Sequence, residues 1–274
     1  MDALDTDFNV HTGLLAHLLP RGAFTAVAFG VETLPRERAV RRRHRHGAGY
    51  ATIVLAGSFV EAGFAGHLAV RPGEALLHGA LDCHADRPLS ARIQILRLPW
   101  ANQSLEGRFQ VDDPDELARL AERDPRAAAL ALGAMLRVAP PREVHWTQAL
   151  AALLAGGTGL SLAQQAAIWG LRPAELSRGF GCAFGVSPKR FRLEARTRRA
   201  WQSVIGSTCK LTHIAQDHGF ADQAHMSRSV RAFTGVAPNI WRRTQRAQRQ
   251  VRSSQLSPAV ASCRQCSAEQ PKHE

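Results

Sequence analysis

Short apolar runs separated by glycine fill the chain between about residues 50 and 100. They read YATIVLAG, GHLAVRPG, EALLHG and ARIQILRLPW. Runs of this length, bounded by turn residues, are typical of β-strands in a small sandwich or barrel. The pattern therefore predicts a β-rich N-terminal domain, either a small sandwich or a small barrel.

After residue 112 the spacing of the apolar residues changes to the period of an α-helix. In residues 113–137 leucines lie among alanines and charged residues, and Pro125 divides the segment into two predicted helices that could form a dimer face or cover the barrel. APPRE at 139–143 is a linker candidate, and the chain beyond 245 has the composition of a disordered basic tail. The predicted fold is α+β with two domains: a β-rich sandwich or barrel at 1–110, a helical linker or dimerisation region at 111–146, an all-α domain at 147–245 and the tail at 246–274.

One phrase occurs twice in the helical part, about fifty residues apart. RPAELSRGFGCAFGVSP begins at residue 172 and ADQAHMSRSVRAFTGVAP begins at residue 221. Upstream of each, a small alanine (Ala166, Ala215) precedes a glycine (Gly170, Gly219) by four positions. Alanine lets two helices approach closely, and glycine permits the left-handed turn that ends the first helix. The spacing predicts two helix-turn-helix units.

The second helix of each unit has an apolar stripe and an opposite face of small, hydrogen-bonding and arginine side chains. The stripes are Leu176, Phe180 and Ala183 in one helix and Met226, Val230 and Phe233 in the other. Small residues let a helix enter the major groove, and arginine can bind phosphate or guanine. The outer faces, candidates for DNA contact, contain Ala174, Ser177, Arg178 and Gly181 in the first copy and Gln223, Ala224, His225, Ser227, Arg228 and Arg231 in the second.

A long helix is predicted between the two copies. Ser187 can cap it, Pro188 suits its first position, and it would run to about Ile205. At 1.5 Å per residue it spans roughly 28 Å, close to the roughly 34 Å between successive major-groove faces on one side of B-DNA. Its arginines would face phosphates or water.

The charge distribution supports a polyanionic partner for the second half. Residues 1–150 contain 17 Lys and Arg against 17 Asp and Glu, whereas residues 151–274 contain 18 against 6, which is the whole net charge of +12. The five cysteines are scattered, so a disulfide scaffold is excluded and a cytoplasmic location is expected. No apolar run reaches the length of a membrane span, and no secretory signal pattern opens the chain.

Residues 160–243 resemble the DNA-binding domain of AraC-type transcriptional regulators, most specifically in HGFADQAHMSRSVRAFTGVAP. The resemblance implies that the protein binds double-stranded DNA and a small-molecule effector. Contact with RNA polymerase and a possible homodimer are implied as well. It also implies base and phosphate contacts at Ala174, Glu175, Ser177, Arg178, Gln223, Ala224, His225, Ser227 and Arg228. The chain departs from the family pattern at Arg172, where a capping serine is usual, and at Gly179 and Gly181, which weaken the first recognition helix by roughly 1 kcal/mol each. Ala221 and Ala224 also replace the usual serines.

The neutral half resembles a cupin-like sensor domain over roughly residues 40–100. The resemblance implies that the N-terminal domain is a β-barrel with an effector pocket lined by His44, His46, Tyr50, Glu61 and His84. A His-x-His pair with a distant histidine is also a cupin metal-ligand set, but the expected carboxylate after His46 is missing, so no metal and no cofactor are expected. Cys263 and Cys266 form only half of a zinc site.

Two other functions remain open at this stage. A cupin-type metalloenzyme with an accessory nucleic-acid-binding domain would need an intact metal set. A non-specific nucleoid or RNA binder would use only the basic half and would bind random and promoter DNA equally. The leading hypothesis is a transcriptional regulator without enzymatic activity.

Overall fold

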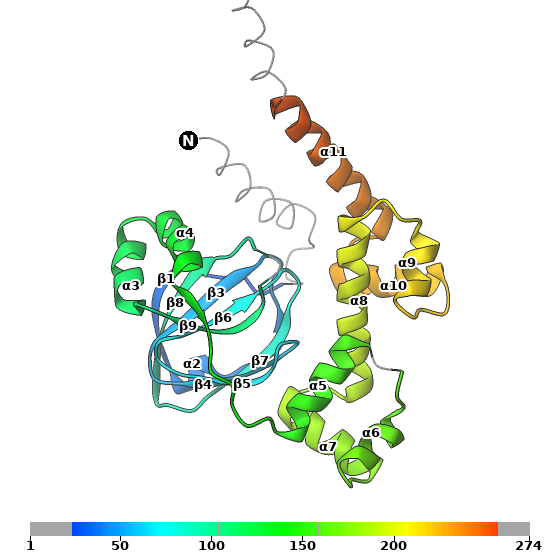
Figure 1. The fold of residues 1–274 in the computed structure, drawn as a ribbon, viewed down its shortest axis with the longest axis horizontal. Coiled ribbons are helices and arrows are strands. Elements are labelled where there is room, and N and C mark those ends of the chain that lie inside the picture. Colours follow the sequence, from blue (N-terminus) through cyan, green and yellow to red (C-terminus); the bar gives the residue numbers. More distant parts are fainter. Residues whose placement is uncertain (1–23, 103–104, 158, 257–274) are drawn as a thin grey trace, which may run out of the picture.

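The computed structural model describes residues 24–102, 105–157 and 159–256 of the chain (Figure 1). Its N-terminal part contains two antiparallel sheets, of six and four strands. The six-stranded sheet has the order β1 (Gly30–Pro35), β8 (Arg92–Pro99), β3 (Tyr50–Ala56), β6 (Glu74–His78), β9 (Gly107–Val111) and β10 (Leu136–Val138). The four-stranded sheet has the order β2 (Arg41–Arg45), β7 (Cys83–Pro88), β4 (Phe59–Gly63) and β5 (Gly66–Val70), and the short helix α2 (Arg36–Ala39) leads into it.

The predicted closure into a barrel is wrong. β1 and β10 are the edges of the larger sheet and β2 and β5 those of the smaller one, and no ladder in the described part of the chain joins the two sheets. The repeated glycine-bounded strands fit an open or a closed arrangement equally well. Closure depends on the pairing of edge strands, which the pattern of a single strand does not record.

Both faces of the larger sheet are buried, which explains the continuous apolar runs. Val54, Leu76 and Ile95 face the smaller sheet in one apolar cluster, whereas their chain neighbours Ile53, Leu77 and Leu96 belong to a second cluster on the other face. Helices α3 (Pro114–Arg123) and α4 (Pro125–Met135) cover that other face (Figure 1).

The two helices begin as the sequence predicts. Asp113 caps α3 and Asp124 caps α4, each followed by a proline at the first helical position. Leu117 and Leu132 are fully buried against the sheet. Of the two roles left open for residues 113–137, the structure therefore supports the cover of the sheet.

The C-terminal part is helical, as predicted. α5 (Trp146–Gly156) is followed by α6 (Leu162–Ile168) and α7 (Pro173–Phe184), and α8 (Pro188–Gly206) links this unit to α9 (Leu211–Asp217) and α10 (Gln223–Thr234). Figure 1 shows the two units at opposite ends of α8. In the described segments, no helix combines the length and the apolar character that crossing a membrane requires.

The last helix corrects the predicted disorder of the tail. α11 (Pro238–Leu256) continues through residues 246–256, where glutamine and arginine, both good helix formers, outweigh the serines that suggested a disordered segment. Cys263 and Cys266 lie outside the described residues.

An apolar cluster crosses from the sheets to the helices. Leu81 and Cys83, beside the smaller sheet, pack with Trp201 and Val204 of α8 and Phe233 of α10. Nearby, Arg198 of α8 donates hydrogen bonds to the carbonyl of Ala80 at 2.9 Å and to Glu106 at 2.8 Å. The two parts of the chain therefore form one packed unit.

Gly179→Ala is expected to lower the free energy of unfolding by about 1–3 kcal/mol, the usual cost of overpacking. A Cβ atom on Gly179 would lie 2.7 Å from Cζ2 of Trp146 in α5, so the glycine is required for close helix packing. Gly181 is the matched control, because a Cβ atom there meets nothing within 4 Å. Gly181→Ala should stabilise α7 by roughly 1 kcal/mol. Urea denaturation measures both, and equal effects would contradict this packing.

Candidate nucleic-acid interface and effector pocket

The two helix-turn-helix turns have the same backbone geometry. Gly170 and Gly219 have positive φ angles of 65° and 68°. In each turn the glycine amide donates to the carbonyl three residues earlier, and the next amide donates to the small alanine, Ala166 or Ala215. Both alanines are buried. The repeat predicted from sequence is therefore a structural repeat.

α7 presents the predicted contact residues of the first unit. Ala174 and Arg178 are exposed and Ser177 is half-buried, while Leu176, Phe180 and Phe184 form the buried stripe. The third buried position is Phe184, whereas the sequence pattern predicts Ala183, which is half-buried. Glu175 accepts a hydrogen bond from the Arg172 amide at 3.0 Å and pairs with its guanidinium. The pair holds Glu175 at the start of the helix, but Arg172 makes no side-chain cap of the kind that a serine would provide.

α10 presents the predicted contact residues of the second unit. Asp222 caps it by accepting from the amide of His225 at 2.6 Å, and Met226, Val230 and Phe233 form the predicted buried stripe. Two of the predicted contact residues, His225 and Ser227, are half-buried, and the ring of His225 packs edge-on against Phe220. The exposed ones are Gln223, Ala224, Arg228 and Arg231.

Helix α8 has the predicted start and length. The Ser187 hydroxyl accepts from the amide of Arg190, Pro188 is the first residue, and the helix has 19 residues. Its arginines do not all face outward. Arg198 is buried in the contact with Ala80 and Glu106, so the prediction that it faces phosphate or water is wrong. The 3.6-residue period places Arg198 on the same side as Trp201, and that side covers the sheets.

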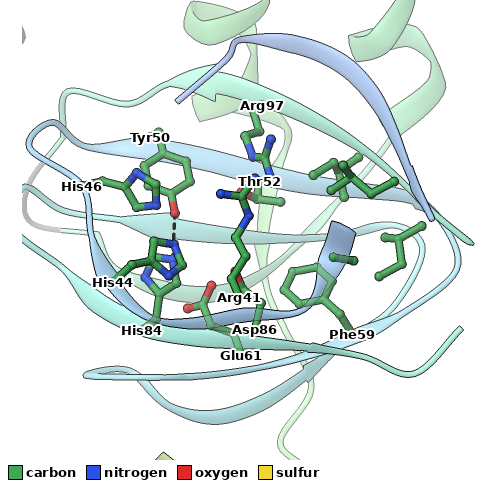
Figure 2. Close-up of a pocket in the computed structure, with 14 residues that line it drawn as sticks. Arg41, His44, His46, Tyr50, Thr52, Phe59, Glu61, His84, Asp86 and Arg97 are labelled. Carbon is green, nitrogen blue, oxygen red and sulfur yellow. Dashed lines mark hydrogen bonds between the residues drawn. The ribbon is translucent and has the colours of Figure 1, made fainter. Parts of the chain in front are cut away.

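A cavity between the two sheets contains all five side chains predicted for the effector pocket. Figure 2 shows His44, His46, Tyr50, Glu61 and His84 gathered around it, with a hydrogen bond of 3.1 Å between Tyr50 and His84. The cavity has a volume of about 40 Å³, enough for a few water molecules. Its further lining residues are Leu34, Ala39, Arg41, Thr52, Phe59, Asp86, Ile93, Ile95 and Arg97.

The ionisable groups of the pocket have strongly perturbed pKa values. Burial lowers the pKa of His46 to about 2 and raises the pKa of Glu61 to about 7. Burial also disfavours the charged form of His84, but the carboxylates of Glu61 and Asp82 outweigh it and raise the pKa of His84 to about 9. At neutral pH a charged His84 thus lies beside a neutral His46.

Sequence reasoning missed two ionisable groups behind this pocket. His78 and Asp82 are buried next to Glu61 and His84. The sequence signal for them is the segment HGALDCH, in which His78, Asp82 and His84 follow or interrupt apolar residues. The pattern does not reveal that these polar side chains point into the fold. Arg41 and Arg97 were missed for the same reason.

Strand β2 links the pocket to the helices. His44 lines the pocket on one side, while Arg43 pairs with Glu194 of α8 at 3.0 Å and Arg45 donates to the carbonyl of Phe233 in α10. Alternate residues of a strand point to opposite sides. One side of β2 therefore lines the pocket, and the other contacts both α8 and α10.

Comparisons with known proteins agree with the helical part. A family model described as a helix-turn-helix domain matches residues 165–244. The C-terminal domain of AraT, a response regulator from Geobacillus stearothermophilus, is 22% identical, covering 38% of this chain and 88% of that one with a TM-score of 0.35. Unsaturated fatty acid-bound ToxT from Vibrio cholerae is 12% identical, covering 81% and 96% with a TM-score of 0.35. No curated protein matches the chain.

The matched segment begins in α6 and ends in α11, so it includes both turns and both recognition helices. The family model, the repeated turn geometry and the helix that joins the two units agree with one another. We therefore identify residues 165–244 as a DNA-binding helix-turn-helix domain of the AraC type.

Proposed function

We propose that this protein is a sequence-specific transcriptional regulator whose DNA binding is modulated by an effector in the N-terminal domain. The observation that carries the proposal is the pair of matched helix-turn-helix units on one continuous helix. Each unit exposes an arginine, Arg178 or Arg228, at the centre of the outer face of its second helix. Such a helix can enter the major groove, where arginine makes two hydrogen bonds to guanine.

The proposed contacts are those of the two recognition helices. Arg178 and Arg228 would read bases, and the neighbouring small and polar residues would let the helices enter the groove. α8, about 28 Å long, would hold the helices on adjacent turns of the duplex. The proposed contact residues are Ala174, Glu175, Ser177, Arg178, Gln223, Ala224, His225, Ser227, Arg228 and Arg231.

Modulation would act through strand β2. The effector would bind among His44, His46, Tyr50, Glu61 and His84, and β2 would transmit the change through Arg43 and Arg45 to α8 and α10. Homodimer formation, contact with RNA polymerase and a cytoplasmic location belong to the same proposal, by resemblance to AraC-type regulators. The alternative, a cupin-type metalloenzyme, gains no support from the family match.

An operator with two half-sites tests the geometry. Binding should weaken steeply when about five base pairs are inserted between the half-sites, because this insertion turns the second site by about half a helical turn. An insertion of about ten base pairs should also weaken binding but keep the two faces aligned. Electrophoretic mobility shift and footprinting on the three duplexes measure the effect.

The operator for this experiment can be obtained by selecting genomic DNA fragments that the purified protein binds. Footprints of equal strength on all three duplexes would contradict simultaneous reading by two units. Equal affinity for selected and random duplexes would instead favour non-specific binding by the basic half.

A further inference from the structure

We propose that Glu61, His78, Asp82 and His84 bind a divalent first-row transition-metal ion in the N-terminal domain. Glu61 comes from β4, His78 ends β6, Asp82 lies in the following turn and His84 lies in β7. All four are at least nine-tenths buried, with exposed fractions of 5%, 2%, 5% and 1%. One ligand atom from each lies within 4.8 Å of the others, so small side-chain rotations would bring all four onto one ion.

Two buried nitrogens of this cluster lie close to carboxylates without the geometry of a hydrogen bond. His78 Nε2 lies 3.4 Å from Glu61, and His84 Nδ1 lies 3.4 Å from Asp82. Neither has a hydrogen-bond partner in the described part of the chain. Bonds of about 2.0–2.2 Å to a tetrahedral ion separate neighbouring ligand atoms by about 3.3–3.6 Å. The spacing of these pairs therefore suits two ligands of one metal ion.

The other nitrogen of each ring is already held. His84 Nε2 lies 3.1 Å from the Tyr50 hydroxyl, and His78 Nδ1 lies 2.9 Å from Asp82, a hydrogen bond that Asp82 would exchange for the ion on becoming a ligand. Metal-binding histidines usually bond through the second ring nitrogen in this way, which fixes the ring and its tautomer. The two rings are thus oriented with their free nitrogens toward the cluster.

The donor set also indicates the kind of ion. Two buried carboxylates favour a positive charge beside them; His84 supplies it in the metal-free protein, and a divalent cation would supply it on displacing the ring proton. Imidazole with carboxylate oxygen suits zinc, iron and manganese. Four protein ligands complete a tetrahedral site, as in structural or regulatory metal centres, whereas a catalytic zinc keeps an open position.

The neighbouring three-histidine group is a weaker candidate. The ligand atoms of His44, His46 and His84 also lie within 4.8 Å, but this group has no carboxylate. Its shared member His84 has Nε2 at the Tyr50 hydroxyl, whereas its Nδ1, which has no hydrogen-bond partner among the described residues, lies 3.4 Å from Asp82 of the four-residue cluster. The four-residue cluster is therefore the metal site.

The site is connected to the DNA-binding helices through its own turn. Leu81, between two of the ligands in sequence, has a φ of 60°, a left-handed conformation rare for leucine. It is fully buried in the cluster that contains Trp201 and Val204 of α8. Ligation of Asp82 and His84 would fix this turn against α8. A regulatory role for the ion rests on the proposed function, but metal binding itself does not.

Cobalt and zinc titration of the full-length, metal-free protein tests the proposal. Addition of Co²⁺ should give visible d–d bands without thiolate charge-transfer bands, and Zn²⁺ should displace it at one equivalent. Glu61→Gln and Asp82→Asn should each weaken Zn²⁺ binding by at least tenfold, in the range found when a metal-site interaction is removed. The matched control is His67→Gln, at a half-buried histidine of β5 outside the cluster.

Three results would overturn the proposal. They are no metal binding by the wild-type protein, thiolate bands that place the ion on cysteines, and loss of binding in His44→Gln together with full binding in Glu61→Gln. Near-ultraviolet circular dichroism verifies that each variant is folded. The cobalt spectrum of the wild-type protein tests metal binding even if a variant fails to fold. The titration contains no DNA, so failure of the regulator proposal would leave its result unaffected.

Discussion

Arg228→Ala is expected to weaken binding to the operator by about 1–3 kcal/mol, or roughly 5- to 150-fold, and to relax sequence preference at one base pair. Arg228 is exposed near the middle of α10, on the face opposite Met226 and Val230. An arginine at this place on a recognition helix can make two hydrogen bonds to guanine. Fluorescence anisotropy with operator and scrambled duplexes at several salt concentrations measures the loss.

Arg228→Lys separates base reading from phosphate binding. Lysine keeps the charge but loses the planar fork that fits guanine. If Arg228 reads a base, the lysine variant should bind the operator almost as poorly as the alanine variant and bind scrambled DNA normally. Recovery of operator binding by lysine would mean a phosphate contact, and unchanged binding by alanine would refute the placement of α10 in the groove.

The helical domain could be predicted from sequence because its signals are local. The turn at Gly219, the cap at Ser187 and the stripe of Met226, Val230 and Phe233 each depend on residues within one or two helical turns. A second copy with the same spacing made the prediction stronger. The limits of the stripe in α7, the extent of α11 and the contacts that single helix residues make with distant parts of the chain needed the structure.

The N-terminal domain was less predictable because its features depend on contacts distant in sequence. Glu61 and His84 were expected in a pocket, but their partners His78 and Asp82 were not, since strand register decides which polar residues turn inward. The burial of Arg198 depends on Ala80 and Glu106, each about a hundred residues away. Gly179 shows the same limit, because its neighbour Trp146 belongs to another helix.

Strand β2 explains why a cluster of basic residues lies inside this fold. The run RRRHRH looks like a solvated surface strand in sequence. In the structure its histidines line the pocket, and Arg43 and Arg45 lie against aromatic rings of the helical domain, Phe191 and Phe233. Two arginines of this basic run thus belong to the contact between the sheets and the DNA-binding domain, together with the apolar cluster around Leu81.

Glu194→Gln is expected to destabilise the protein by about 3 kcal/mol, near the lower end of the range for breaking a buried ion pair. The side chains of Arg43 and Glu194 are only 9% and 10% exposed. Removal of the carboxylate charge leaves the Arg43 guanidinium buried without a counter-charge. The glutamine oxygen can still accept a hydrogen bond, which keeps the loss from being larger.

Arg43→Met should cost less, because Glu194 also pairs with Arg190 at 2.7 Å and keeps a counter-charge. The double variant should be less destabilised than the sum of the two single variants, with a coupling free energy of about 0.5–3 kcal/mol. Urea denaturation of the four proteins completes the cycle. Additive effects would mean that Arg43 and Glu194 do not stabilise each other, and β2 would then lose its main charged contact with α8.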